Sequence, residues 1–171
     1  FGHIKIDVKK IGADMLSASS HKFHGPKGCG FLYADKNTGI KPFIYGGGQE
    51  RGQRSGTENV PGILGMVKAA EISHRIMDEN NRKLRKINDY MTDRILNEID
   101  DCICNGNREN RLSNNINVSF GNIDGKALLV LLDMEGVYVS GASACNGGKE
   151  KSYVLSSLGV PEKYADGTIR M

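Results

Sequence analysis

Groups capable of covalent chemistry are concentrated in residues 19–28. Lys22 stands there beside two imidazoles, those of His21 and His24, with a second amine at Lys27. An amine forms an imine readily when its ammonium form is destabilised, which burial or neighbouring positive charge brings about. The segment therefore offers the residue types that imine formation at Lys22 requires.

Two hydroxyls, those of Ser19 and Ser20, precede this lysine and could hold a phosphate. Pyridoxal phosphate needs both an imine-forming lysine and a seat for its phosphate, so the residue types favour that cofactor. A solvated loop, in which a lysine beside glycines is only a turn residue, would have a similar composition. Local chemistry leaves both interpretations open.

A second segment, residues 46–59, combines glycines with Arg51, Arg54 and Thr57 just before a predicted helix. Backbone amides, guanidinium groups and a helix N-terminus all favour the binding of an anion such as phosphate. The alternative is a glycine-rich surface loop without a ligand.

A third segment, residues 139–149, places Cys145 in a loop of small residues with Lys149 and Lys151 nearby. A thiolate nucleophile needs exposure, mobility and nearby positive charge, and this sequence predicts all three. An unreactive loop cysteine is the alternative.

Taken together, the three segments resemble cysteine desulfurases, which are pyridoxal-phosphate enzymes of the class-V aminotransferase family with the aspartate-aminotransferase fold. The resemblance rests on Ser-Ser-His-Lys-Phe-His-Gly-Pro-Lys-Gly, on Gly-Gly-Gly-Gln-Glu-Arg-Gly with Arg-Ser-Gly-Thr, and on Ser-Gly-Ala-Ser-Ala-Cys. Residues 146–148, Asn-Gly-Gly, depart from the Ser- or Thr-rich continuation typical of the family. That departure leaves the loop geometry and the partner preference open.

The resemblance implies how the cofactor would be held. Lys22 would be the imine lysine and proton carrier, while Ser19 and His21 would contact the cofactor. Thr57 would bind the cofactor phosphate of the partner subunit, so an obligate homodimer is expected.

For the substrate, the resemblance implies that Cys145 takes the sulfur of L-cysteine as a persulfide and that Arg170 pairs with the substrate carboxylate. A guanidinium group suits that task because it can donate two parallel hydrogen bonds. L-alanine would be the other product, and the sulfur would pass to an iron–sulfur scaffold or a tRNA-thiolating enzyme. No resident metal is expected, although Cys145 could be a transient iron–sulfur ligand.

Other functions remain open at this stage. A selenocysteine lyase or another fold-type-I pyridoxal-phosphate enzyme would share Lys22, and a non-catalytic dimerisation or partner-docking module would need none of the chemistry. The resemblance covers only the later part of the family's sequence, so we expect a fragment cut at both ends. Without the earlier residues that hold the cofactor ring in the family, the fragment alone should bind the cofactor weakly or not at all and should be inactive.

Composition and charge exclude several other classes. Of the 171 residues, 39% are hydrophobic, and the formal net charge is +3, which is too small and too scattered for a nucleic-acid surface. The basic run at residues 82–86 is expected to be a solvated helix face. No apolar run approaches the ~18 residues of a membrane span, and the first residues lack a signal-peptide pattern. A cytoplasmic protein is predicted.

The four cysteines do not suggest a disulfide framework, because the expected nucleophile must be a free thiol. Cys102 and Cys104 have no second pair or histidine at zinc spacing, so they are expected near a strand rather than in a metal site. Cys29 opens the apolar run 30–33, which predicts a buried strand with Cys29 as a packing residue.

These segments must be positioned by an α/β framework. We expect the later part of a cofactor-binding large domain over 1–62, an interdomain helix over 63–78, and a small C-terminal α/β domain over 79–171. Periodicity predicts helices over 61–77, capped by Thr57 or Asn59, and over 79–99. It also predicts shorter helices over 125–134 and 152–158, and strands over 3–8, 115–120, 137–139 and 168–170.

Overall fold

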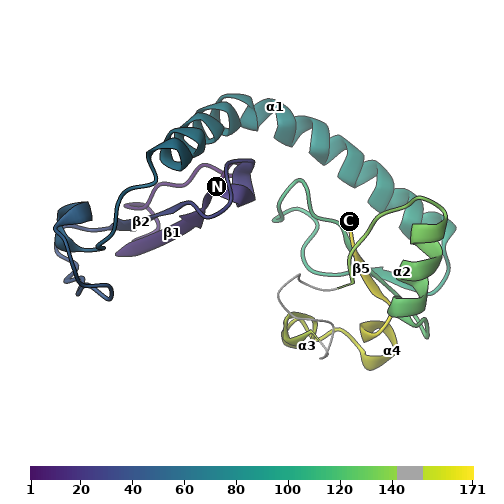
Figure 1. Ribbon diagram of the computed structural model, residues 1–171. Helices are drawn as coiled ribbons and strands as arrows, with labels where there is room; N and C mark the ends of the chain where they lie inside the picture. The colour runs from purple at the N-terminus through teal and green to yellow at the C-terminus, as the bar shows by residue number, and fades with distance from the viewer. Residues whose placement is uncertain (142–151) are drawn as a thin grey trace. The chain divides into compact units, whose positions relative to one another are not determined.

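The computed structural model describes residues 1–141 and 152–171. Cys145 lies outside the described residues, together with Lys149 and Lys151. The described chain is mixed α/β, as predicted, and it divides into two compact units, Phe1–Glu79 and Asn80–Met171 (Figure 1). The domain limits expected from the sequence remain a prediction.

The first unit is built on an antiparallel hairpin. Strands β1 (Met15–Ser19) and β2 (Gly30–Ala34) pair from Met15↔Ala34 to Ser19↔Gly30, and the loop between them contains the short 3₁₀ helix η1 (Ser20–Phe23). The strand expected over 3–8 is wrong, since no strand forms there. Instead the Asp7 carboxylate accepts the backbone N–H groups of Lys9 and Lys10 at 3.1 and 3.2 Å, a local turn that competes with strand pairing.

The strand predicted over 30–33 forms as part of β2, but its predicted burial is wrong. Phe31 and Leu32 are exposed in β2, and Cys29 is half-buried. A sheet of only two strands cannot cover its own faces, so an apolar sequence does not guarantee burial.

Helix α1 (Val60–Glu98) is continuous where the sequence predicted two helices. The chain contains neither glycine nor proline between Met66 and Glu98, so nothing interrupts the helical backbone at the shift in periodicity. Asn59 Oδ1 accepts the backbone N–H of Gly62 at 3.1 Å. Of the two caps predicted, Asn59 is therefore the one that forms.

The second unit contains a three-stranded antiparallel sheet in the order β3-β4-β5, formed by Cys102–Cys104, Asn117–Phe120 and Thr168–Arg170. Its core consists of Ile116, Val118 and Ile169, against which apolar side chains of α1 and of α2 (Gly125–Met134) pack. The strands near 115–120 and 168–170 and the helix over 125–134 are confirmed.

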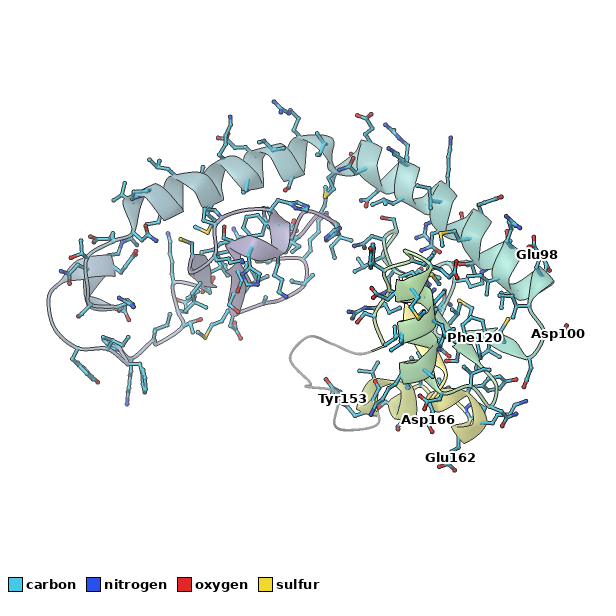
Figure 2. All side chains as sticks on the ribbon, turned by 45° about the vertical axis from the view of Figure 1, so that its right-hand side comes forward. Glu98, Asp100, Phe120, Tyr153, Glu162 and Asp166 are labelled. Carbon is cyan, nitrogen blue, oxygen red and sulfur yellow. The ribbon has the colours of Figure 1, made fainter. Side chains whose placement is uncertain are left out.

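Two short helices, α3 (Tyr153–Ser157) and α4 (Glu162–Ala165), complete the second unit. The strand expected over 137–139 does not form, because only Ser140 pairs, through an isolated bridge to Arg170. Figure 2 labels Phe120 on β4 and Asp166, which follows α4. The backbone joins these segments directly, since Phe120 N–H donates to Gly167 O at 3.0 Å. None of the helices in the described part of the chain is both long enough and apolar enough to cross a membrane.

Candidate active site

Lys22 lies on a closed loop at the end of the β1–β2 hairpin. The N–H of Ser20 donates to Cys29 O at 2.9 Å, and the N–H of Gly25 donates to Ser20 O at 3.0 Å. Phe23 is buried, with 2% of its surface exposed, whereas Lys22 and its neighbour His21 are exposed. The loop is therefore anchored by Phe23 and presents Lys22 outward. The described part of the chain does not bury Lys22, so burial does not destabilise its ammonium form there.

Gly25 is required by the packing inside this loop. The hydroxyl of Ser20 is fully buried, and a Cβ at Gly25 would overlap it. Ser20 Oγ has no hydrogen-bond partner among the residues that the structure describes. The close approach of Ser20 and Gly25 therefore leaves the Ser20 hydroxyl buried without a hydrogen-bond partner in the described chain.

One face of α1 supports the lysine loop. Small residues recur there every three or four positions, which places them on one side of a helix. A Cβ at Gly65 would lie 2.7 Å from Pro26 Cγ, and Ser73 Oγ donates to Phe23 O at 3.4 Å. The members of this face are Gly62, Gly65, Ala69 and Ser73. Sequence reasoning missed them, although small residues at this spacing were a signal that another segment packs closely.

The glycine-rich segment has an ordered backbone of its own. Glu50 and Arg51, in the 3₁₀ helix η2 (Gln49–Gly52), adopt positive φ angles of 50° and 57°. Buried Ser55 donates through Oγ to Gly47 O at 2.8 Å, which closes the loop. Thr57 is exposed beyond it. The segment is a shaped loop rather than a featureless linker.

Gly56, beside Thr57, has a conformation that only glycine adopts readily. Its φ is 113°, and a Cβ there would meet Arg54 Nη1 at 2.7 Å. The same Arg54 Nη1 donates to Ser55 O at 2.7 Å. The backbone before the exposed Thr57 hydroxyl is therefore fixed by a guanidinium group and a glycine.

These two loops fit a phosphate-bearing aldehyde such as pyridoxal phosphate. Lys22, whose amine could form an imine, and its neighbour in sequence His21 are both exposed. The exposed Thr57 hydroxyl follows backbone that accommodates no side chain at Gly56. Hydroxyl, amine and imidazole are the donor types that such a cofactor needs.

Arg170 is joined by backbone hydrogen bonds to Ser140. Its backbone N–H donates to Ser140 O at 2.6 Å, and Ser140 N–H donates to Arg170 O at 3.0 Å. The side chain of Arg170 is exposed at the end of β5. The structure thus brings Arg170 to the residue five positions before Cys145, which itself is outside the described residues.

A buried polar network lies next to Arg170 in the sheet. Asn105 Nδ2 donates to Ser119 Oγ at 2.7 Å, and the hydroxyls of Ser119 and Thr168 are 2.5 Å apart. Only 5%, 0% and 6% of these three side chains, in that order, are exposed. Sequence reasoning missed the network, because polar residues in a short strand are ordinarily expected to face water.

Asp101 links the start of β3 to α4, which precedes β5. Lys163 Nζ and Tyr164 Oη both donate to Asp101 Oδ1 at 2.8 Å. These hydrogen bonds, with that of Lys163 the larger contribution, lower the pKa of the Asp101 carboxyl below its ordinary value. All three side chains are at the surface or near it, so the role we assign to them is structural.

The two cysteines of β3 are half-buried. Cys102 and Cys104 lie in β3, as expected from the sequence. Burial, reinforced by Asp100 and Asp101, raises the pKa of the Cys102 thiol, which keeps it protonated. Within residues 1–141 and 152–171, no cluster of three or more potential metal ligands occurs.

Comparisons with known proteins show the family to which this chain belongs. The profile of the family described as Aminotransferase class-V matches residues 1–171. The cysteine desulfurase IscS of Methanosarcina thermophila is 47% identical over 171 residues, covering 99% of this chain and 42% of that protein. The IscS of Dictyoglomus turgidum is 49% identical over 170 residues, covering 99% of this chain and 43% of that protein. The chain spans less than half the length of these curated relatives.

Solved structures give the same picture. A NifS-like protein superposes with a TM-score of 0.87 at 39% identity, covering 99% of this chain and 43% of the other. A NifS-like protein from Rickettsia africae superposes with a TM-score of 0.84 at 33% identity, covering 100% of this chain and 45% of the other. SspA, solved in complex with cysteine, has a TM-score of 0.70 at 33% identity, covering 99% and 46% of the two chains.

Proposed function

Because this chain belongs to the class-V aminotransferase family, we propose that the whole protein is a pyridoxal-phosphate-dependent cysteine desulfurase. It would convert L-cysteine to L-alanine and transfer the sulfur to Cys145 as a persulfide. The observation that carries the proposal is the closed hairpin loop, which anchors Phe23 inside and presents Lys22 outside. The curated relatives named cysteine desulfurase support it.

Lys22 is the proposed anchor of the cofactor. When bound, pyridoxal phosphate supplies an electron-accepting ring that weakens the bonds at the α-carbon of an amino acid. Lys22 would hold the cofactor through Nζ, and its amine would carry the α-proton of the substrate. Ser19 and His21, on either side of buried Ser20, would contact the cofactor.

Thr57 would bind the phosphate of the cofactor that is anchored in the other subunit. The proposal therefore includes an obligate homodimer, in which each glycine-rich loop completes the partner's site. The guanidinium group of Arg54 supports this role, because its Nη1 would lie 2.7 Å from a Cβ at Gly56, next to Thr57, and a guanidinium group favours phosphate.

Arg170 and Cys145 would act on the substrate. The Arg170 guanidinium would hold the substrate carboxylate through two parallel N–H···O bonds. Cys145 Sγ, as the thiolate, would attack the substrate sulfur, so that a sulfur–sulfur bond forms while the carbon–sulfur bond breaks. The electron pair of the broken bond stays on the substrate carbon, whose protonation gives L-alanine.

The persulfide would then pass to an acceptor protein, either an iron–sulfur scaffold or a tRNA-thiolating enzyme. The proposal includes no direct contact with nucleic acid, because the acceptor alone would handle it. It also includes a cytoplasmic location, since a sulfur-accepting thiol requires reducing surroundings.

The test uses the full-length protein with L-cysteine and measures both alanine and sulfide. We expect Lys22→Ala to reduce both products by about 10²-fold or more. Cys145→Ala should abolish sulfide release while the cofactor stays bound, and Lys36→Ala, an exposed lysine after β2 without an assigned role, should retain activity. Sulfide release that survives Cys145→Ala would favour a selenocysteine lyase or another enzyme of the fold. A wild-type protein that forms no alanine would favour the non-catalytic module.

A further inference from the structure

We propose that Asn59 is a positioning residue that ties the lysine loop to the segment bearing Thr57, an inference that rests on the proposed function. Its side-chain amide faces in two directions. Oδ1 accepts the backbone N–H of Gly62 at 3.1 Å, and Nδ2 donates to Cys29 Sγ at 3.4 Å. A side-chain amide can make both bonds at once, because its oxygen accepts and its nitrogen donates.

The two partners of Asn59 belong to the two loops of the candidate site. Cys29 closes the lysine loop, since its carbonyl accepts the N–H of Ser20, two residues before Lys22. Gly62 is in the first turn of α1, and Asn59 caps that helix two residues after Thr57. One side chain therefore contacts the end of the Lys22 loop and fixes the chain direction just after Thr57.

Gly62 makes this arrangement possible. A Cβ at this position would overlap Cys29 Sγ and would lie 2.6 Å from Asn59 Nδ2. The sulfur, the amide and the helix backbone thus meet where only a hydrogen atom fits. A closely packed contact of this kind transmits a displacement of either loop to the other, because it has no void to absorb the movement.

The consequence is that two functions of Asn59 can be separated by substitution. Asn59→Asp retains an oxygen that caps α1 but removes the amide N–H group that donates to Cys29. Asn59→Ala removes both interactions. The first change should loosen the lysine loop alone, whereas the second should also free the backbone that carries Thr57.

The experiment uses the full-length protein stripped of cofactor and titrated with pyridoxal phosphate and, separately, with pyridoxal, which lacks the phosphate. We expect Asn59→Ala to raise the apparent Kd for pyridoxal phosphate about fivefold or more, and to raise that for pyridoxal less. Asn59→Asp should weaken both ligands by the same factor. Asn97→Ala, an exposed position on the same helix, is the matched control and should leave both Kd values unchanged. Reduction with borohydride followed by mass spectrometry of the Lys22 peptide reports the anchored fraction independently of turnover.

Wild-type affinities in both Asn59 variants, with Lys22 still required for attachment, would overturn the positioning role and leave the proposed function intact. A wild-type protein that binds neither ligand would remove the proposed function, and this inference with it.

A second pair of variants decides the matter if Asn59→Ala does not fold. Gly62→Ala should weaken binding of both ligands, because its methyl group displaces Cys29. Adding Cys29→Ala to Gly62→Ala should restore part of the affinity, since the overlapping sulfur is gone. Failure of that rescue would contradict the proposed contact.

Discussion

The two units of this chain position Lys22 and Arg170, the residues to which we assign roles, by opposite means. In Phe1–Glu79 the lysine loop is held by backbone hydrogen bonds and by glycines that allow close approach, with Phe23 as its buried anchor. In Asn80–Met171 the strand that ends at Arg170 is held by an apolar core on one face and by buried hydroxyls on the other. The first unit should therefore be destabilised by substitutions that enlarge a side chain, and the second unit by substitutions that shorten one.

The largest effect is expected in the apolar core of the second unit. Ile169→Ala should lower the free energy of unfolding by about 2–5 kcal/mol, because it leaves a cavity beside Val118 and Ile116. Ile169→Val, the graded control, should cost about 0.5–1.5 kcal/mol. Urea denaturation of the full-length protein measures both. Equal losses for the two variants would mean that cavity volume does not govern this region.

In the first unit, Gly25→Ala should cost about 1–3 kcal/mol, because the new methyl group overlaps the buried Ser20 hydroxyl. The same variant should lose cofactor anchored at Lys22. Ser20→Ala alone should be neutral or stabilising, since it removes a buried hydroxyl without a partner in the described chain. Combined with Gly25→Ala it should restore stability, measured by thermal melting, and cofactor content, measured by visible absorbance. If the double variant is as damaged as Gly25→Ala, the overlap is not the cause.

A smaller effect is expected from the buried hydroxyls beside Arg170. Thr168→Val preserves shape but leaves Ser119 without one of its partners, at a cost of about 1 kcal/mol. If the network also aims Arg170, the KM for L-cysteine should rise more than kcat falls. The double variant Ser119→Ala with Thr168→Val should be less damaged than the sum of the single changes. Strict additivity would show that the two hydroxyls do not interact.

The smallest effect concerns the exposed Asp101 and its dependence on pH. Lys163 and Tyr164 lower the pKa of its carboxyl in the folded protein, so the interaction stabilises the fold above the ordinary aspartate pKa of ~3.9. This contribution is lost as the pH falls through the lowered pKa. Asp101→Asn should remove it, so the stability difference between wild type and variant should be constant near neutral pH and shrink in acid. Chemical denaturation across that range tests this, and a difference that grows in acid would have the wrong sign.

Local sequence predicted the elements whose pattern is self-contained. Helix 125–134 begins after Asp124, whose side chain accepts the N–H groups of Lys126 and Ala127, and such a cap can be read from neighbouring residues. The same holds for Asn59 before α1. By contrast, the strand over 137–139 and the burial of β2 depended on which other segments lay nearby, and those expectations were wrong.

The sequence by itself determined the family to which this chain belongs, and residue types such as Lys22, Thr57 and Arg170 in their motifs predicted the chemistry. Tertiary structure alone decided how these groups are held. Three contacts join residues that local patterns do not relate, because the partners are distant in the chain or lie across a tight loop. They are the contacts of Gly62 with Cys29, of Gly25 with Ser20 and of Arg170 with Ser140. Close packing depends on the distance between atoms in space, and no local periodicity or composition contains that distance.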